Sequence, residues 1–223
     1  MDNSRTELLL GKENIDKISK SHVTIVGTGG VGGYVALFLA RAGISKFTII
    51  DFDKITPSNI NRQAVAFTDT IGLDKVKVLK DMILKINPDA QIDAVNERLC
   101  EENVTNLVKN NTFVVDAIDS VKDKVALICY CKKNNINIIS AMGAGNRFDS
   151  PIFTVVDIEK THDDGLAKAI RKRLRELGIK GLDVAISYSK PQKFDKIIGS
   201  ISYYPPACAC VIASYVINKI IGK

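Results

Sequence analysis

The stretch HVTIVGTGGVGGYVALFLARAG, residues 22–43, decides the fold. It opens with apolar and β-branched residues, which is typical of a short buried strand, and closes with the apolar spacing of a helix that ends near Gly43. Between them the chain satisfies the pattern G-x-G-x-x-G, in which glycines let backbone amides approach a phosphate at the amino-terminal end of the helix. These glycines are Gly27, Gly29, Gly30 and Gly32.

An acidic residue follows at the position that this pattern requires. Asp51 ends the next strand-like run, KFTIID (46–51), at the spacing where a carboxylate binds ribose hydroxyls. We therefore expect a bound nucleotide, because a glycine-rich turn without a ligand does not explain strand, loop, helix and acid in this order. The pattern alone leaves NAD, FAD and ATP open.

Strand-like and helix-like segments alternate along the first half of the chain. This alternation predicts an α/β, Rossmann-like fold with a mostly parallel sheet and helices on both faces. Strands are predicted at 91–99, 112–118 and 136–142, and helices at 74–88, 101–110 and 121–135.

The pattern changes after about residue 150. Residues 151–161 and 182–190 resemble strands on either side of a basic helix at 166–178, and an apolar helix ends the sequence. No linker separates the two halves. We therefore predict a single domain over 1–223, with a nucleotide-binding half at about 1–150 and an elaborated half after it.

The composition fits a soluble globular protein, since 46% of the 223 residues are apolar and 25% are charged. The net charge of +6 permits an anionic partner such as a nucleotide or RNA. No secretory signal is recognised at the start, and the apolar run near the end is interrupted by Asn218 and Lys219, so membrane association is not expected. The odd number of cysteines, five, fits a reducing cytoplasm best.

A second group of polar residues follows Asp51, and NAD binding does not require it. Arg62 and Lys75 are expected to grip phosphate oxygens, the arginine through two parallel hydrogen bonds and the lysine as a point charge. Because NAD lacks a triphosphate, two extra cations favour ATP, although each alone is compatible with a solvated surface charge. The group comprises Asp53, Asn59, Asn61, Arg62, Gln63 and Lys75.

Asp119 lies in VVDAIDS (114–120), just past a predicted strand and at the same edge of the sheet. A carboxylate there suits Mg²⁺, which usually takes one or two protein carboxylates together with phosphate oxygens and water. The other interpretation is that Asp119 caps the helix that follows, and the two roles are compatible.

Five motifs in this order resemble the adenylation domain of the ubiquitin-activating superfamily, over most of residues 4–145. They are GTGGVG, IIDFD, SNINRQ, IGLDKV and VVDAID. The resemblance implies that Asp51 binds ribose and that Asp119 binds Mg²⁺. It also implies that Arg5 reaches the nucleotide of the partner subunit in a homodimer. Catalytic roles are thus expected for Arg5, Arg62, Lys75 and Asp119. Nucleotide contacts are expected for the glycines, Asp51, Asp53, Asn59, Arg62 and Lys75.

The cysteines argue against the members of that superfamily that activate carrier proteins. Those enzymes usually hold zinc with two C-x-x-C pairs, whereas this chain has only C-x-C pairs, at Cys129/Cys131 and Cys208/Cys210. Residues two apart on a helix do not face each other, so no zinc is expected. Residues 132–207 contain no cysteine that could form a thioester.

Three further stretches resemble the tRNA threonylcarbamoyladenosine dehydratases: SRTELLLGKENIDKI (4–18), ISAMGAGNRFD (139–149) and DIEKTHDDGLAKAIRKRLRELGIK (157–180). This resemblance implies that ATP activates the carboxylate of threonylcarbamoyladenosine at position 37 of tRNA as an acyl-adenylate, after which ring closure removes water. It implies tRNA rather than DNA as the nucleic acid, and a possible sulfur-relay protein as a further partner. Substrate and dimer contacts are then expected in about 151–223.

The basic helix suits a tRNA substrate, because its cations could contact phosphates of a stem or loop, although a solvated helix face is the other interpretation. We expect His162 in a surface loop, and Tyr203 and Tyr204 at a strand end packed on the core rather than on a base. The segment 190–200 is short compared with similar proteins, which bears on how an anticodon loop is held. The five cations are Lys168, Arg171, Lys172, Arg173 and Arg175.

Two other functions remain open. A zinc-free enzyme that adenylates a ubiquitin-like or sulfur-carrier protein would use the same nucleotide site. An NAD-binding oxidoreductase explains the glycines and Asp51 but leaves Arg62, Lys75 and Asp119 without a role. We rank the tRNA-modifying dehydratase first.

Overall fold

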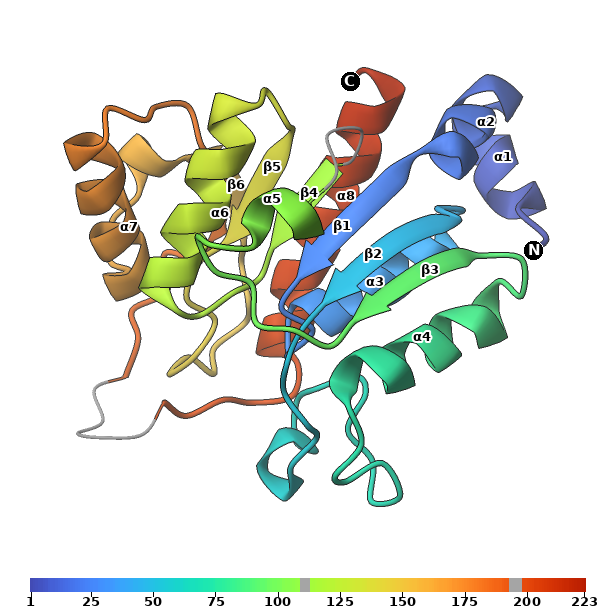
Figure 1. Cartoon of the computed structure of the whole chain (residues 1–223), viewed down its shortest axis with the longest axis horizontal. Coiled ribbons are helices and arrows are strands. Elements are labelled where there is room, and N and C mark those ends of the chain that lie inside the picture. Colours follow the sequence, from blue (N-terminus) through green and yellow to red (C-terminus); the bar gives the residue numbers. More distant parts are fainter. Residues whose placement is uncertain (109–112, 193–197) are drawn as a thin grey trace.

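The computed structural model describes residues 1–108, 113–192 and 198–223, and it contains one seven-stranded sheet in the order β3-β2-β1-β4-β5-β7-β6 (Figure 1). All neighbouring strands are parallel except β6, which pairs antiparallel with β7 at the edge. The predicted α/β, Rossmann-like fold is confirmed. The strands are β1 His22–Val26, β2 Lys46–Ile50, β3 Gln91–Val95, β4 Phe113–Asp116, β5 Ile138–Ala141, β6 Thr154–Asp157 and β7 Asp183–Ile186.

Helices cover both faces of the sheet, and successive strand residues alternate between them. Ile25 and Val115 belong to the core beneath α2, α3, α4 and α8, whereas Val26 and Val114 belong to the core beneath α5, α6 and α7. The helices are α1 Ser4–Leu10, α2 Lys12–Lys20, α3 Gly32–Arg41, α4 Lys75–Ile86, α5 Val104–Leu107, α6 Val121–Lys133, α7 Gly165–Glu176 and α8 Tyr204–Ile221, with short 3₁₀ turns at Pro57–Asn59 and Ile158–Lys160.

The apolar helix α8 is a structural element of the core. It is the one helix in the described residues that is long and apolar enough to cross a membrane. Tyr204, Cys208 and Ile212 are fully buried, and the helix packs along α3 and against the sheet. Its apolar composition is therefore explained by packing against α3.

Several predicted boundaries are wrong. The strand predicted at 151–161 contains only β6, because a 3₁₀ turn begins at Ile158. Tyr203 and Tyr204 do not end a strand. Tyr204 begins α8 and Tyr203 immediately precedes it, and the first turn accommodates prolines because its amide groups need no partner within the helix. The helix predicted at 101–110 is confined to α5, and the end of that prediction lies outside the described residues.

The glycine turn allows the chain to fold back on itself at the carboxyl end of β1. A Cβ atom on Gly32 would lie 1.8 Å from the carbonyl oxygen of Gly27. Gly27 has a φ of +86°, and a Cβ atom there would lie 2.6 Å from the carbonyl oxygen of Ala117, just beyond β4. Both contacts are with backbone atoms, so no side-chain movement relieves them. Helix α3 can start beside β1 and β4 only because these positions are glycine.

We predict that Gly32→Ala destabilises the fold, whereas Gly165→Ala does not. A Cβ atom on Gly165 would meet nothing within 4 Å, so this variant is a matched control at another helix start. Overpacking of this kind typically costs about 1–3 kcal/mol, which for a chain of this size lowers the melting temperature by several degrees. Thermal unfolding followed by circular dichroism measures the difference. Equal melting temperatures for the two variants would contradict the close contact.

Candidate active site

The predicted nucleotide contacts gather at the carboxyl ends of β1, β2 and β4, below the sheet in Figure 1. Asp51 follows β2 and is buried beside the glycine turn. Its Oδ2 accepts hydrogen bonds from the amide (2.7 Å) and the hydroxyl (2.9 Å) of Thr28, and its Oδ1 accepts one from the amide of Asp53 (2.9 Å). These bonds orient the carboxylate, and Oδ1 retains a lone pair for a ribose hydroxyl.

Lys75 and Asp53 form an ion pair with 2.7 Å between Nζ and Oδ2. The lysine side chain is 6% exposed and the aspartate side chain 49% exposed, so the pair lies at the boundary of the interior. The amide of Lys75 also donates to the carbonyl of Asp53, at 3.1 Å. The ammonium group therefore has a fixed place at the start of α4, and it keeps further N–H donors for a phosphate oxygen.

Arg62 and Asn59 are held by local bonds in the segment after the 3₁₀ turn. The Nη1 atom of Arg62 donates to the carbonyl of Ser58 (2.8 Å) and to Oδ1 of Asn61 (2.9 Å). Its Nε and Nη2 atoms have no hydrogen bond within the described chain, which leaves one side of the guanidinium for an anion. Asn59 is buried, and its Oδ1 accepts from the amide of Thr56 at 3.2 Å.

Asp119 is exposed in the loop between β4 and α6. The interpretation of this residue as a helix cap is wrong, since Ser120 occupies the position before α6. The carboxylate is therefore available at the edge where the glycine turn ends. It lies three residues beyond Asp116, whose backbone pairs with Val26 immediately before the glycine turn.

A buried ion pair that sequence reasoning missed supports this loop. Asp116 and Lys124 are both fully buried, with 3.0 Å between Oδ1 and Nζ, and Lys124 also donates to the carbonyl of Ile118 at 2.8 Å. Ser140 on β5 donates its hydroxyl to Oδ2 of Asp116 at 2.7 Å. Burial raises the pKa of Asp116 above its ordinary value, although Lys124 and Ser140 favour the charged form. Asp116 ends β4 and Lys124 lies on α6, so no local spacing in the sequence signals this pair.

Gln63 is a second residue whose role the sequence left unassigned. It is 8% exposed, and its Oε1 atom has no hydrogen-bond partner in the described part of the chain. Its Nε2 atom lies 3.7 Å from where a Cβ atom on Gly29 would be. A buried amide oxygen without a partner is costly, so this group is expected to bond a ligand or water at the glycine turn.

The family of the chain follows from this site and from its relatives. A profile of the ThiF family matches residues 3–223. The chain belongs to the ThiF family. The curated relative from Bacillus subtilis, tRNA threonylcarbamoyladenosine dehydratase, is 38% identical over 84% of this chain and 75% of its own length. The Escherichia coli protein of the same name is 39% identical over 76% of this chain and 64% of its own length.

Solved structures agree with this placement in the ThiF family. The Escherichia coli tRNA N6-threonylcarbamoyladenosine dehydratase in complex with AMP has a TM-score of 0.94 at 33% identity, covering 98% of this chain and 93% of that one. The same enzyme in complex with ATP has a TM-score of 0.90 at 32% identity, over the same shares of the two chains. The resemblance to these dehydratases that was inferred from the sequence is confirmed.

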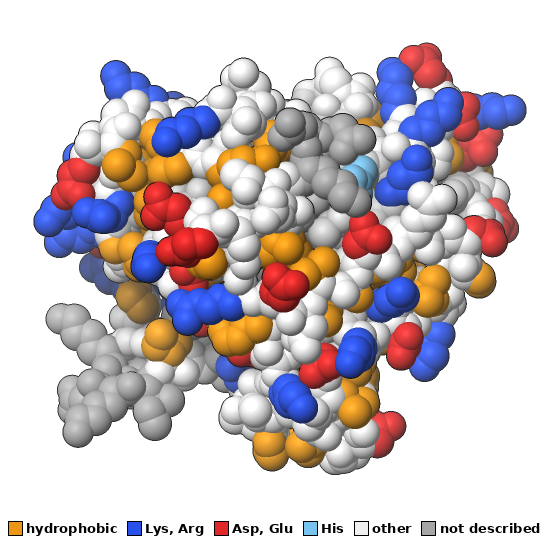
Figure 2. Space-filling view, viewed as in Figure 1, with side chains coloured by type: hydrophobic (Ala, Val, Ile, Leu, Met, Phe, Trp, Pro, Cys, Tyr) orange, Lys and Arg blue, Asp and Glu red, His pale blue; other side chains and the backbone are white. Residues whose placement is uncertain are grey.

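Arg5 lies at the other end of the sheet, and several of the predicted tRNA-binding cations on α7 already have partners within the chain. Arg5 is exposed on α1, beside the amino-terminal ends of the strands, so it cannot contact the nucleotide of its own chain (Figure 1). Of the α7 cations, Arg171 donates to the carbonyl of Thr161 and Arg175 pairs bidentately with Glu159. Lys168 and Lys172 are exposed. Figure 2 shows acidic side chains interspersed with the basic ones, so the cations do not form one continuous patch on this face.

The cysteines have the environments of packed side chains. Cys131 and Cys208 are buried in α6 and α8, and burial raises the pKa of each thiol to about 12. Their neighbours in the C-x-C pairs, Cys129 and Cys210, are more exposed, which agrees with residues two apart facing different directions. In residues 1–108, 113–192 and 198–223, no three His, Cys, Asp or Glu side chains cluster as a metal site would require.

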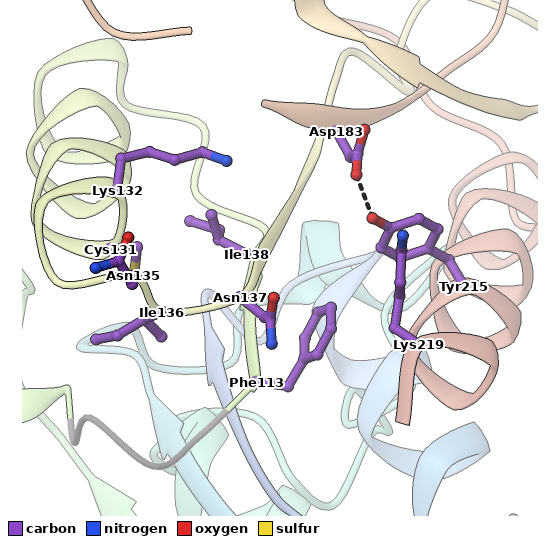
Figure 3. Close-up of a pocket in the computed structure, with 10 residues that line it drawn as sticks. All are labelled: Phe113, Cys131, Lys132, Asn135, Ile136, Asn137, Ile138, Asp183, Tyr215 and Lys219. Atoms are coloured by element: carbon purple, nitrogen blue, oxygen red, sulfur yellow. Dashed lines mark hydrogen bonds between the residues drawn. The ribbon is translucent and has the colours of Figure 1, made fainter. Parts of the chain in front are cut away.

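A cavity of about 290 Å³ lies at the opposite end of the sheet, where β4, β5 and β7 begin (Figure 3). Tyr215 of α8 donates its hydroxyl to Asp183 of β7 there, and burial, followed by this carboxylate, raises the pKa of the tyrosine. The ammonium of Lys219 lies 5.3 Å from the centre of the Tyr215 ring. These contacts join α8 to the sheet. Since open α/β sheets bind ligands at the carboxyl ends of their strands, we assign the active site to the other edge.

We predict that Lys124→Met destabilises the protein strongly. The substitution leaves the carboxylate of Asp116 buried without its partner, which typically costs about 3–5 kcal/mol and lowers the melting temperature by roughly 10 °C. Lys122→Met, at an exposed position of the same helix, is the control. Adding Asp116→Asn to Lys124→Met should recover part of the loss. A melting temperature of Lys124→Met within a degree or two of the control would contradict this role.

Proposed function

We propose that this chain is an ATP-dependent dehydratase that cyclises threonylcarbamoyladenosine at position 37 of tRNA. The observation that carries the proposal is the 38% identity, over 84% of the chain, with the Bacillus subtilis dehydratase. Membership of the ThiF family and the ATP complex of the Escherichia coli enzyme support adenylation as the chemical step. Asp51, Arg62 and Lys75 then have roles that an NAD enzyme would not need.

The reaction follows from the chemistry of a carboxylate, which is a poor electrophile because it has no good leaving group. Its oxygen attacks the α-phosphorus of ATP, pyrophosphate departs, and an acyl-adenylate forms. The neighbouring nitrogen of the same side chain then attacks the acyl carbon, loses its proton, and expels AMP. The ring is closed and the elements of one water are removed. Because the attack is intramolecular, positioning supplies much of the rate and no protein nucleophile is required.

The residues at the carboxyl edge match the charges of ATP. Asp51 accepts from the ribose hydroxyls, and Asn59, Arg62 and Lys75 contact the phosphates. The positive charges of Arg62 and Lys75 stabilise the transition state there. Asp53 holds Lys75 in place and contributes to the nucleotide site through that pair. The glycine turn at Gly27, Gly29, Gly30 and Gly32 presents backbone amides to the phosphates.

Magnesium fits the residues at this edge. Asp119 is exposed, whereas Asp116, the other carboxylate of the same segment, is occupied by Lys124. A single protein carboxylate completed by phosphate oxygens and water is an arrangement that Mg²⁺ commonly adopts. Asp119 would hold the ion, which when bound neutralises phosphate charge.

Substrate and assembly complete the proposal. The cations of α7 would contact tRNA phosphates, and its two exposed lysines are the better placed because all three arginines already bond to the chain. These cations are Lys168, Arg171, Lys172, Arg173 and Arg175. Arg5 would act on the nucleotide of a second copy, which makes the enzyme a homodimer. The domain then has its substrate and dimer contacts in about 151–223. We assign the activity to the cytoplasm, where tRNA is modified, with a sulfur-relay protein as a possible partner.

The direct test incubates the purified protein with ATP, Mg²⁺ and tRNA that carries threonylcarbamoyladenosine. Digestion and mass spectrometry should reveal a nucleoside lighter by one water, and only when ATP is present. Unmodified tRNA is the control. An unchanged nucleoside, with pyrophosphate exchange that depends on a protein with a Gly-Gly tail, would instead establish activation of a carrier protein.

We predict that Asp119→Ala lowers turnover by at least about a hundredfold, as expected for loss of a group that stabilises charge in the transition state. The fold should survive, because Asp119 is exposed. Asp89→Ala, exposed before β3 at the other end of the sheet, is the matched control and should retain full turnover. Turnover of Asp119→Ala equal to that of the control would remove Asp119 from the mechanism.

We further predict that Arg5→Ala and Asp119→Ala complement each other. Each variant alone should be nearly inactive, but a mixed dimer contains one site with both an intact Asp119 and an intact Arg5 from the other copy. Random assembly of equal amounts should restore about a quarter of the wild-type rate, because half of the dimers are mixed and each has one complete site. Unfolding and refolding the two variants together allows exchange. No recovery after confirmed exchange would show that Arg5 does not act across a dimer.

A further inference from the structure

Two exposed aromatic residues at the carboxyl edge of the sheet are joined by a hydrogen bond from the side chain of one to the backbone of the other. Phe148, in the loop that follows β5, is 62% exposed, and Tyr203, immediately before α8, is 43% exposed. They are 55 residues apart in sequence, and the hydroxyl of Tyr203 donates to the carbonyl of Phe148. Neighbouring Tyr204 is fully buried, so the two consecutive tyrosines have different functions. Exposed aromatic rings offer a flat π-face to which an unpaired base can bind.

This aromatic pair lies beside the nucleotide site. The carbonyl of Ser200 accepts a hydrogen bond from Asn61, next to Arg62, at 2.9 Å. Pro205 packs on the glycine turn, since a Cβ atom on Gly30 would lie 3.1 Å from its Cβ atom. Residues 200–205 therefore connect the phosphate-binding groups to the loop of Phe148, and Tyr203 lies within that connection. In Figure 1 the start of α8 and this loop lie at the same edge of the sheet.

The loop that carries Phe148 is held rigidly by its neighbour. Arg147 is 5% exposed, and its guanidinium donates to the carbonyls of Ser189 (2.7 Å) and Gly143 (2.9 Å). It also pairs at 3.4 Å with Asp164, whose other oxygen caps α7. The arginine thus ties the loop to the end of β7 and the start of α7. This bonding leaves Arg147 no free donor for RNA, and it fixes the backbone from which Phe148 projects.

A second set of bonds fixes the same loop from the other side. Asn146 has a φ of +58°, in the left-handed region that few residues besides glycine and asparagine adopt readily. Its amide donates to the carbonyl of Gly199 at 2.7 Å, its Oδ1 accepts from the amide of Gly199 at 2.6 Å, and its carbonyl accepts from the amide of Gln192. The loop is therefore preorganised, and its exposed ring can bind with little loss of conformational entropy.

We propose that Phe148 and Tyr203 form the stacking platform for the adenine base that carries the substrate group. This inference rests on the proposed function and adds to it where the base is bound. Single-stranded RNA loops are recognised by stacking unpaired bases on aromatic side chains, since every base has a π-face. A base on this pair places its carboxylate-bearing side chain next to Arg62 and the glycine turn, where the carboxylate must meet the α-phosphate of ATP. The cations of α7 then contact the flanking phosphates.

The kinetic test compares variants that remove or keep each ring. Phe148→Leu and Tyr203→Leu keep apolar volume but lose the π-face, and each should raise the KM for tRNA by about tenfold, as expected for the loss of one stacked base. Tyr203→Phe keeps the ring and should stay within about twofold of wild type, despite losing its bond to the carbonyl of Phe148. ATP affinity should be unchanged in all three. Equal KM values for Tyr203→Leu and Tyr203→Phe would overturn stacking at this position.

The absence of tryptophan from the chain allows a direct optical test. Phe148→Trp introduces a unique fluorophore, and an anticodon stem-loop carrying threonylcarbamoyladenosine should quench it, whereas ATP alone should not. Lys85→Trp, at the exposed end of α4 by the opposite edge, should not respond to the RNA. Unquenched emission of Phe148→Trp, in a protein that still dehydrates tRNA, overturns the stacking platform and leaves the proposed function intact. Wild-type protein that neither binds nor modifies the tRNA overturns both.

Two partners could cover the surface around Phe148, namely RNA and a second copy of the chain. The oligomeric state of a Phe148 variant distinguishes them. Size-exclusion chromatography with light scattering should give the same mass for Phe148→Leu as for wild type. A lower mass would assign Phe148 to a contact between copies and overturn the proposal.

Discussion

The lack of a Cβ atom at Gly27, Gly30 and Gly32 is the constraint on which the active edge depends. Three segments meet there: the end of β1, the loop after β4 and the start of α8. A Cβ atom on Gly27 would collide with Ala117, and one on Gly30 would press on Pro205. The same close packing that opens backbone amides to a phosphate therefore also sets the place of the Asp119 loop and of Tyr203. The glycine turn thus sets the places of the residues proposed to bind the nucleotide and the substrate base.

Most charged groups at this edge have partners within the chain before any ligand binds. Asp51 accepts three hydrogen bonds, and Lys75 pairs with Asp53. Beneath them, Lys124 neutralises Asp116 in the interior. Such pairing orients the groups in advance, so little reorganisation is needed when charge develops on a bound phosphate. Arg62, Gln63 and Asp119 differ, because each keeps atoms that the described chain does not use.

The basic helix α7 shows why a count of cations is a poor guide to an RNA surface. Arg171 donates to the carbonyl of Thr161, and Arg175 pairs with Glu159. Arg173 pairs with Glu176 at 2.8 Å. Exposed ion pairs of this kind contribute little stability and can exchange for phosphate. In the proposed function, the net charge of α7 would attract RNA, and the loop held by Arg147 would carry the ring on which a base docks.

The sequence by itself determined the sheet, the glycine turn and the acid after β2, because each depends on short-range patterns of period, spacing and backbone freedom. It also placed Arg62, Lys75 and Asp119 at one edge, since parallel strands end together. It could not separate Tyr203 from Tyr204, or reveal that Lys124 faces Asp116 and that Arg147 binds three segments. Those facts depend on which chain segments pack together across long sequence distances, and only the tertiary structure decides how a side chain is oriented and which partner it meets.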